Sequence, residues 1–324
     1  MAYPLPGEAA DHPAPAPASE PVMAPGPTVA AMQLGATLRR LREAGRMTGG
    51  QAARALDASP AKISRIESGK TQVEQRDMRT LLDLYGITEQ AAAADRQLAE
   101  LRDELLGLAE LSCQDDYWTE LSDLLPVPVR HLLALEAESS LITTYDQAVP
   151  PMVQTDAYAR AAASALNPDS PRWRGGLGIR VLTRRRGVLK ALAPPTYWAL
   201  IQESALRRSP SADPAVMRGQ LASLARHAAE RKITIQVVPD DTGMALNTPG
   251  PFTLLRFHHP DVPSVVLQEA MTTIRASWTP AEVDACHLVF NSMATKALTP
   301  QDSAALITRL LDEMPPGPPP TGRR

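Results

Sequence analysis

The sequence predicts a multidomain protein, with an all-α N-terminal helix-turn-helix domain and a C-terminal α+β domain whose small sheet is flanked by helices. Between residues 29 and 86, apolar residues recur at helical spacing in four segments separated by turn signals. Beyond residue 115, short apolar runs bounded by Pro, Gly, Asp or Asn alternate with helical segments. The length of 324 residues suits two or three domains.

Both ends of the chain are rich in proline. Residues 1–28 hold eight prolines, and residues 314–324 end in PPGPPPTGRR, so both segments are predicted to be disordered tails. No basic residue precedes an apolar run near the start, and no run of about 18 apolar residues exists, so neither a secretory signal nor a membrane span is predicted. The two distant cysteines, Cys113 and Cys286, suit free thiols in a cytoplasmic protein.

Charge is sorted along the chain, although the net charge is only −3. Residues 34–80 contain ten basic and five acidic side chains, whereas residues 81–123 contain two basic and eleven acidic ones. A basic module followed by an acidic one is the asymmetry expected of a nucleic-acid-binding protein with a separate regulatory part.

Two longer helices flank the centre of the first domain. The first begins near residue 29, places Leu34, Leu38 and Leu41 on one face, and ends at Gly45. The other covers residues 74–85.

Two short helices lie between them. Thr48 caps the first, which ends near residue 56. Ser59 caps the second, Pro60 takes its first position, where a missing N–H costs nothing, and Gly69 ends it. Two short helices joined by a tight turn form a helix-turn-helix, whose second helix enters the major groove of double-stranded DNA.

The second short helix has one apolar side and one side suited to DNA. Ile63 and Ile66 face the core, while small residues on the opposite side allow close approach to bases. Arg65 has the geometry to bond a guanine edge through two hydrogen bonds, and Lys62 suits a phosphate or a guanine. The residues predicted to contact DNA are Thr48, Gln51, Ser59, Pro60, Ala61, Lys62, Ser64, Arg65 and Lys70.

The stretch TGGQAARALDASPAKISRIESGKTQV resembles the helix-turn-helix of Xre or Cro/C1-type repressors, with their S-x-I-S-R-x-E-x-G signature. The resemblance covers residues 29–85. It implies a structural pair between Glu67 and Arg42. It also exposes a departure: where the family usually has a DNA-contacting Gln, this chain has Gly49, and the next Gln is Gln51.

Residues 87–114 are predicted to form an acidic connecting helix. Within it, one unbroken helix from Thr88 to Leu111 would carry an apolar heptad stripe, made of Ala91, Ala94, Leu98, Leu101, Leu105 and Leu108. Two interpretations stay open: the stripe packs against the rest of the chain, or it forms the seam of a homodimer. A dimer would pair two reading helices on a palindromic operator.

Residues 115–313 are predicted to form the α+β domain. Its expected strands lie within residues 140–155, 197–203, 233–241, 251–257 and 264–270. Its expected helices are residues 155–165, 179–192, 213–230, 280–296 and 299–313. The short link near residues 258–262 predicts an antiparallel hairpin.

The segments MVQTDAYARA, VMRGQLASLARHA, ITIQVVPDDTG and GPFTLLRF resemble the C-terminal domain of actinobacterial WhiJ-like, antitoxin-like transcriptional regulators. The resemblance implies a regulator that is encoded beside a small partner protein. We therefore expect a cytoplasmic, sequence-specific DNA-binding transcriptional regulator, a homodimer, whose C-terminal domain senses a partner protein or a small ligand. The alternative is an antitoxin-like protein whose main role is to bind the neighbour-encoded partner.

No catalytic constellation, metal site or cofactor site is predicted. His258 and His259 fall in a turn, and Cys286 and His287 point to different sides of a helix. Glu203 and Glu269 each close a predicted strand. Carboxylates at strand ends are more often hydrogen-bond acceptors than acid–base pairs. The basic run TRRRGVLK, residues 183–190, is either a solvated helix face or a grip for an acidic partner or DNA phosphates.

Overall fold

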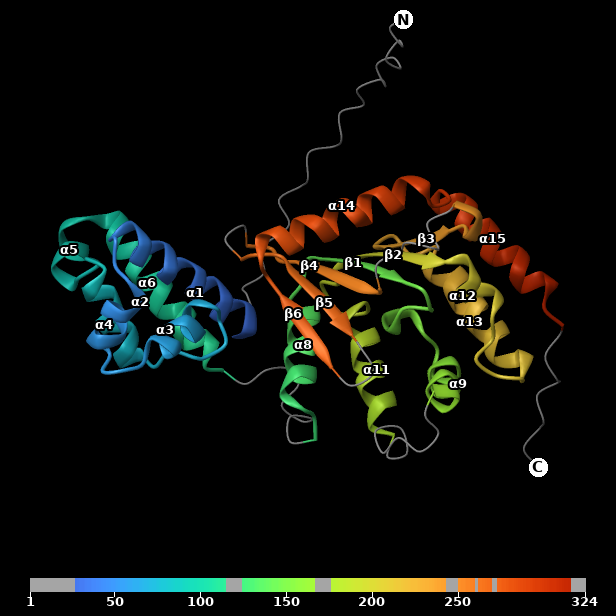
Figure 1. Ribbon diagram of the computed structural model, residues 1–324, viewed down its shortest axis with the longest axis horizontal. Helices are drawn as coiled ribbons and strands as arrows, with labels where there is room; N and C mark the ends of the chain where they lie inside the picture. Colours follow the sequence, from blue (N-terminus) through green and yellow to red (C-terminus); the bar gives the residue numbers. More distant parts are fainter. Residues whose placement is uncertain are drawn as a thin grey trace, which may run out of the picture.

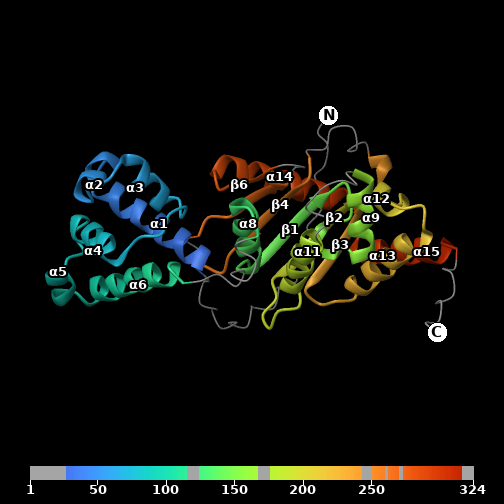
Figure 2. The same ribbon diagram turned by 90° about the horizontal axis from the view of Figure 1, so that it is seen from below.

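The computed structural model describes residues 27–114, 124–166, 176–242, 250–259, 262–269 and 273–315. A helical N-terminal domain lies beside a C-terminal domain built on a six-stranded mixed sheet (Figures 1 and 2). The predicted fold class is confirmed. Most of the two expected tails lies outside the described residues, and helix α1 already begins at Pro27. None of the described helices is both long enough and apolar enough to cross a bilayer.

The N-terminal domain contains six helices within the described residues. They are α1 (Pro27–Ala44), α2 (Gly49–Ala55), α3 (Pro60–Glu67), α4 (Gln75–Leu84), α5 (Glu89–Ala94) and α6 (Arg96–Ser112). The hydroxyl of Thr48 caps α2 by accepting the N–H of Gln51, and the hydroxyl of Ser59 caps α3 by accepting the N–H of Lys62. The four helices expected between residues 29 and 86 are therefore present, with the expected caps.

Two glycines allow α1 and α3 to pack backbone against backbone. A Cβ atom at Gly35 would lie 2.4 Å from the carbonyl oxygen of Ile66, closer than any side chain tolerates. After α3, Gly69 turns the chain with a φ of +65°, and a Cβ there would lie 2.8 Å from the Cα of Met32. The position of α3 on α1 thus depends on the absence of these two side chains.

The expectation of one unbroken helix from Thr88 to Leu111 is wrong, because the chain is extended at Asp95, with φ −135° and ψ 116°. The carboxylate of Asp95 accepts the N–H groups of two following residues and so starts α6 afresh. Leu105 and Leu108 of the heptad stripe are buried in the core of the N-terminal domain. The C-terminal end of the stripe therefore packs within the chain.

The sheet has the strand order β3-β2-β1-β4-β5-β6. The strands are β1 (Leu141–Asp146), β2 (Thr196–Gln202), β3 (Ile233–Val238), β4 (Phe252–Arg256), β5 (Val265–Glu269) and β6 (Ile274–Ser277). β1, β2 and β3 are parallel, whereas β4, β5 and β6 continue from β1 in antiparallel fashion. The predicted hairpin between β4 and β5 is present, and β6 is an additional strand.

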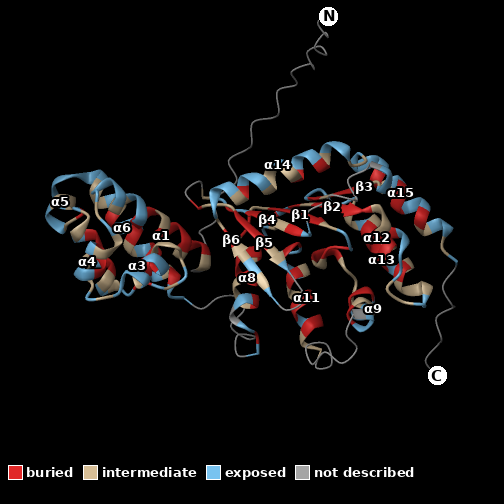
Figure 3. Ribbon diagram, viewed as in Figure 1, coloured by how far each residue is buried: buried red, intermediate tan, exposed pale blue. Residues whose placement is uncertain are grey.

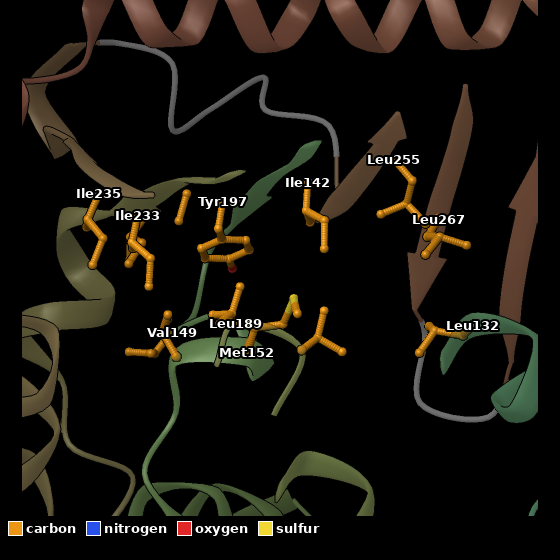
Figure 4. Close-up of a cluster of buried hydrophobic side chains, with 14 of the residues drawn as sticks. Leu132, Ile142, Val149, Met152, Leu189, Tyr197, Ile233, Ile235, Leu255 and Leu267 are labelled. Carbon is orange, nitrogen blue, oxygen red and sulfur yellow. The ribbon is translucent and has the colours of Figure 1, made fainter. Parts of the chain in front are cut away.

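Helices cover both faces of the sheet. They are α8 (Val127–Ala137), α9 (Asp156–Leu166), α11 (Leu177–Val188), α12 (Glu203–Arg207), α13 (Pro214–His227), α14 (Pro280–Lys296) and α15 (Pro300–Glu313), with 3-10 turns η1 (Pro151–Val153) and η2 (Asp240–Thr242). One face packs on α14 through residues such as Leu200, Leu254 and Phe290. The other face forms the larger core, which includes Tyr197 and Leu255 (Figure 4). Figure 3 shows that the strands are largely buried and that α14 turns exposed residues outward.

Candidate nucleic-acid interface

The N-terminal half of α3 presents an exposed face. Ser59, Pro60, Ala61, Ser64 and Arg65 are all exposed. On the opposite side, Ile63 and Ile66 are each 2% exposed and pack in the core of the domain. The hydrogen bond at Ser59 uses the hydroxyl, and Pro60 has no N–H, so the helix begins with a compact, neutral tip. This tip can approach a DNA groove, with Arg65 one turn behind it.

Both lysines that were predicted to contact DNA are held by other parts of the protein. The ammonium of Lys62 lies 2.6 Å from a carboxylate oxygen of Asp77 in α4. The ammonium of Lys70 lies 5.0 Å from the ring centroid of Trp278 in the C-terminal domain, within cation–π range. Lys62 would have to leave Asp77 to reach a phosphate, and Lys70 lies at the contact between the two domains.

Thr48 and Gln51 form a reciprocal cap at the start of α2. The N–H of Thr48 donates to Oε1 of Gln51 at 2.7 Å, and the N–H of Gln51 donates to Oγ1 of Thr48 at 3.3 Å. Both side chains are exposed. The role of Gln51 as a cap was missed at the level of sequence, although a Thr followed three residues later by Gln is the signature of this arrangement.

The Arg42–Glu67 pair expected from the family resemblance joins α1 to the last turn of α3. Nε and Nη2 of Arg42 donate to the two carboxylate oxygens of Glu67 at 2.6 and 2.9 Å, and Nη1 donates to the carbonyl oxygen of Met47 at 2.8 Å. The side chains are 13% and 11% exposed. The hydrogen bond to Glu67 raises the pKa of Arg42 above its ordinary value. This paired geometry fixes α3 in the domain.

Comparison with protein families agrees with this geometry. Residues 33–94 match a family model described as "Helix-turn-helix domain". Residues 129–309, more than half of the chain, match one described as "Domain of unknown function (DUF5753)". The chain belongs to the DUF5753 family. No curated protein and no solved structure gives a match.

The DUF5753 domain holds the helix-turn-helix domain through α1. Glu138, which follows α8, accepts the N–H of Thr28 at 3.1 Å and that of Val29 at 2.7 Å. Farther along α1, Nε2 of Gln33 lies 2.9 Å from Nε2 of His259. Val29 also belongs to the large core of the DUF5753 domain. The first turns of α1 therefore lie in both domains.

A buried ionic cluster lies inside the DUF5753 domain. The guanidinium of Arg185 in α11 contacts Glu136 of α8 and Glu269 of β5, each at 2.6 Å. Arg185 is 5% exposed and Glu136 only 1%. Burial raises the pKa of Glu136, and Arg185 opposes that rise. Burial alone would lower the pKa of Arg185, but the two carboxylates outweigh it and raise the pKa.

The basic run of residues 183–190 is therefore not a free cationic surface. Besides the buried Arg185, Arg186 donates to the carbonyl oxygen of Gln154 at 2.7 Å and pairs with Asp156. A helix face gripping DNA phosphates or an acidic partner would need these guanidinium groups to be available. The centre of this basic run is therefore a structural element of the domain core.

The residues weighed as enzyme candidates have separate environments. His258 is exposed, whereas His259 contacts Gln33. Burial raises the pKa of the Cys286 thiol, and Glu203 pairs with Arg207 four residues later. Within the described parts of the chain, no group of three or more His, Cys, Asp or Glu side chains could hold a metal ion.

Proposed function

We propose that this protein is a sequence-specific, double-stranded-DNA-binding transcriptional regulator of the Xre type. The observation that carries the proposal is the exposed N-terminal half of α3, with Arg65 projecting from a helix that is fixed from behind by Ile63, Ile66 and the Arg42–Glu67 pair. A helix presented in this way is suited to direct readout in the major groove. A homodimer would present two such helices to a palindromic operator.

In this function, Arg65 is the residue that selects a base. A guanidinium offers two parallel N–H donors to O6 and N7 of guanine, a pairing worth about 1–3 kcal/mol of discrimination. Thr48 and Gln51 are exposed at the start of α2, and the start of a helix suits a phosphate. Lys62 would exchange its bond to Asp77 for a phosphate oxygen or a guanine.

The DUF5753 domain would carry the regulatory input, a partner protein or a small ligand. Its resemblance to WhiJ-like regulators supports this role, and so does the contact of Glu138 with the first N–H groups of α1. A change in the position of α8 would be transmitted to the helix on which α3 is packed.

Mobility-shift titrations of the full chain on the promoter region of its own operon test DNA binding. Arg65→Ala should weaken specific binding by about 1–3 kcal/mol and relax base preference at one position. Arg226→Ala, which removes an exposed arginine of α13, serves as the control and should bind as the unmodified protein does. Equal, weak binding of that DNA by the unmodified protein and Arg65→Ala at every salt concentration would refute the proposal.

A further inference from the structure

A cavity of about 200 Å³ lies at the edge of the sheet where β1 and β5 end and β4 begins. β1 is the strand at which the strand order reverses, because β2 and β3 lie on one side of it and β4 on the other. Crevices beyond the carboxyl ends of strands at such a point are where open sheets bind ligands. On one face of the sheet the walls include two hydroxyls, two carboxylates and one apolar side chain: Thr144, Thr253, Asp146, Glu269 and Leu267.

The charges around this cavity do not balance. The guanidinium of Arg185 pairs with two carboxylates, those of Glu136 and Glu269, while a third, that of Asp146, lies within range of its charge. Asp146 accepts the N–H of Ala148 at 2.9 Å, but among the described residues no cationic group forms an ion pair with it. Burial raises the pKa of Asp146 to about 6, which reflects the cost of holding this charge away from water. A bound cation would offset that cost.

A second observation comes from Tyr197 in β2. Its hydroxyl is fully buried and has no hydrogen-bond partner among the described residues. The parallel register places its ring on the same face of the sheet as Ile142 and therefore as Thr144, two residues farther along β1, and Figure 4 shows the ring directed away from the sheet. Burial raises the pKa of Tyr197, and the neighbouring hydroxyl of Thr144 opposes that rise. A buried hydroxyl without a partner, on the same face of the sheet as Thr144 and Asp146, is available to a polar ligand.

We propose that this cavity binds a small organic cation, a short primary alkylamine, with its ammonium between Asp146 and Glu269. The alkyl chain would lie against Leu267. The volume suits a ligand of a few heavy atoms, and the paired threonine hydroxyls, whose oxygens are 3.0 Å apart, offer further acceptors. A metal ion fits less well, because the described carboxylates form no group that could coordinate one.

The cavity is connected to α1 by direct contacts. Glu269 binds Arg185, which binds Glu136 in α8, and Glu138 at the end of α8 holds the first turn of α1. An ammonium at Glu269 competes with Arg185 for that carboxylate and so alters the restraint on α8. This regulatory consequence rests on the proposed DNA-binding function, whereas amine binding does not.

Calorimetric titration of the full chain with n-propylamine tests the site. The probe should bind, while its neutral and anionic counterparts, 1-propanol and propionate, should not. Asp146→Asn should weaken amine binding at least ten-fold, and Thr253→Val should weaken it several-fold. The control Asp284→Asn, an exposed carboxylate on α14, should leave it unchanged. Equal binding of amine and alcohol, or unchanged amine affinity in Asp146→Asn, would overturn the site.

Coupling is measured separately, by DNA titrations with and without n-propylamine. The amine should change DNA affinity at least three-fold in the unmodified protein. Glu138→Gln should retain amine binding but lose this effect. If the amine binds and no specific DNA does, the proposed function fails and the amine site stands. If specific DNA binds and the amine does not, the amine site fails and the proposed function stands.

Discussion

The guanidinium of Arg42 and the carboxylate of Glu67 meet face to face, through two hydrogen bonds of 2.6 and 2.9 Å, at the point where α3 ends against α1. Both side chains are mostly shielded from water. The pair therefore acts on the orientation of the proposed reading helix without using any group that would contact DNA.

Arg42→Ala should lower the free energy of unfolding by about 3 kcal/mol, because it leaves the carboxylate of Glu67 shielded and unpaired. The matched control is Arg39→Ala, which breaks an exposed pair with Glu43 and should cost about 0.5 kcal/mol or less. Urea unfolding of both variants measures the difference. Equal losses would show that the Arg42–Glu67 pair contributes no more than a surface pair.

Asp77→Asn should strengthen DNA binding several-fold. In the structure Asp77 holds the ammonium of Lys62, and the amide would release it for a phosphate. One added phosphate contact should also steepen the dependence of log affinity on log salt concentration by about 0.9. Titrations at several salt concentrations measure both quantities, and Lys62→Met in the same background should cancel the gain. An unchanged slope in Asp77→Asn would mean that Lys62 does not reach the DNA.

Arg185→Met should destabilise the protein by about 3–5 kcal/mol at pH 7, because it leaves Glu136 buried without a cation. The loss should shrink as the pH falls. With the pKa of Glu136 raised in the folded state, the folded chain binds a proton before the unfolded chain does, so acid relieves the penalty. Denaturant unfolding between pH 7 and pH 5 tests this sign. A loss that stays constant or grows toward pH 5 would contradict it.

Gly35→Ala should destabilise the helix-turn-helix domain by about 1–3 kcal/mol, since the new methyl group would meet the backbone of Ile66 and Glu67. Gly107→Ala is the opposite case. Gly107 lies within α6, and a Cβ there meets no atom within 4 Å, so alanine should stabilise the helix by about 0.5–1 kcal/mol. Thermal unfolding of the two variants should therefore shift in opposite directions.

The helix-turn-helix could be predicted nearly to the residue, because its signals are local. Thr48, Ser59 and Pro60 act on backbone groups within one turn of themselves. Local signals also explain the missed break at Asp95: an apolar heptad stripe continues across it, and only the capping carboxylate marks the new start.

The C-terminal domain was predicted less completely, because its features depend on distant partners. The helix α8 is apolar on most sides, with Leu132, Leu133 and Leu135 all buried, so it shows little helical periodicity. The strand β6 has only four residues and is defined by pairing with β5. Arg185 was weighed as a surface cation, since its two carboxylates come from segments 49 and 84 residues away.

The sharing of α1 has a consequence for how the protein melts. Val29 and Met32 belong to the core of the DUF5753 domain, while Ala30, Leu34 and Leu38 of the same helix belong to the other core. Neither core can open without uncovering apolar side chains that the other needs. The two domains are thereby linked into one cooperative unit, and a fragment that ends after α6 would expose Val29 and Met32 to water.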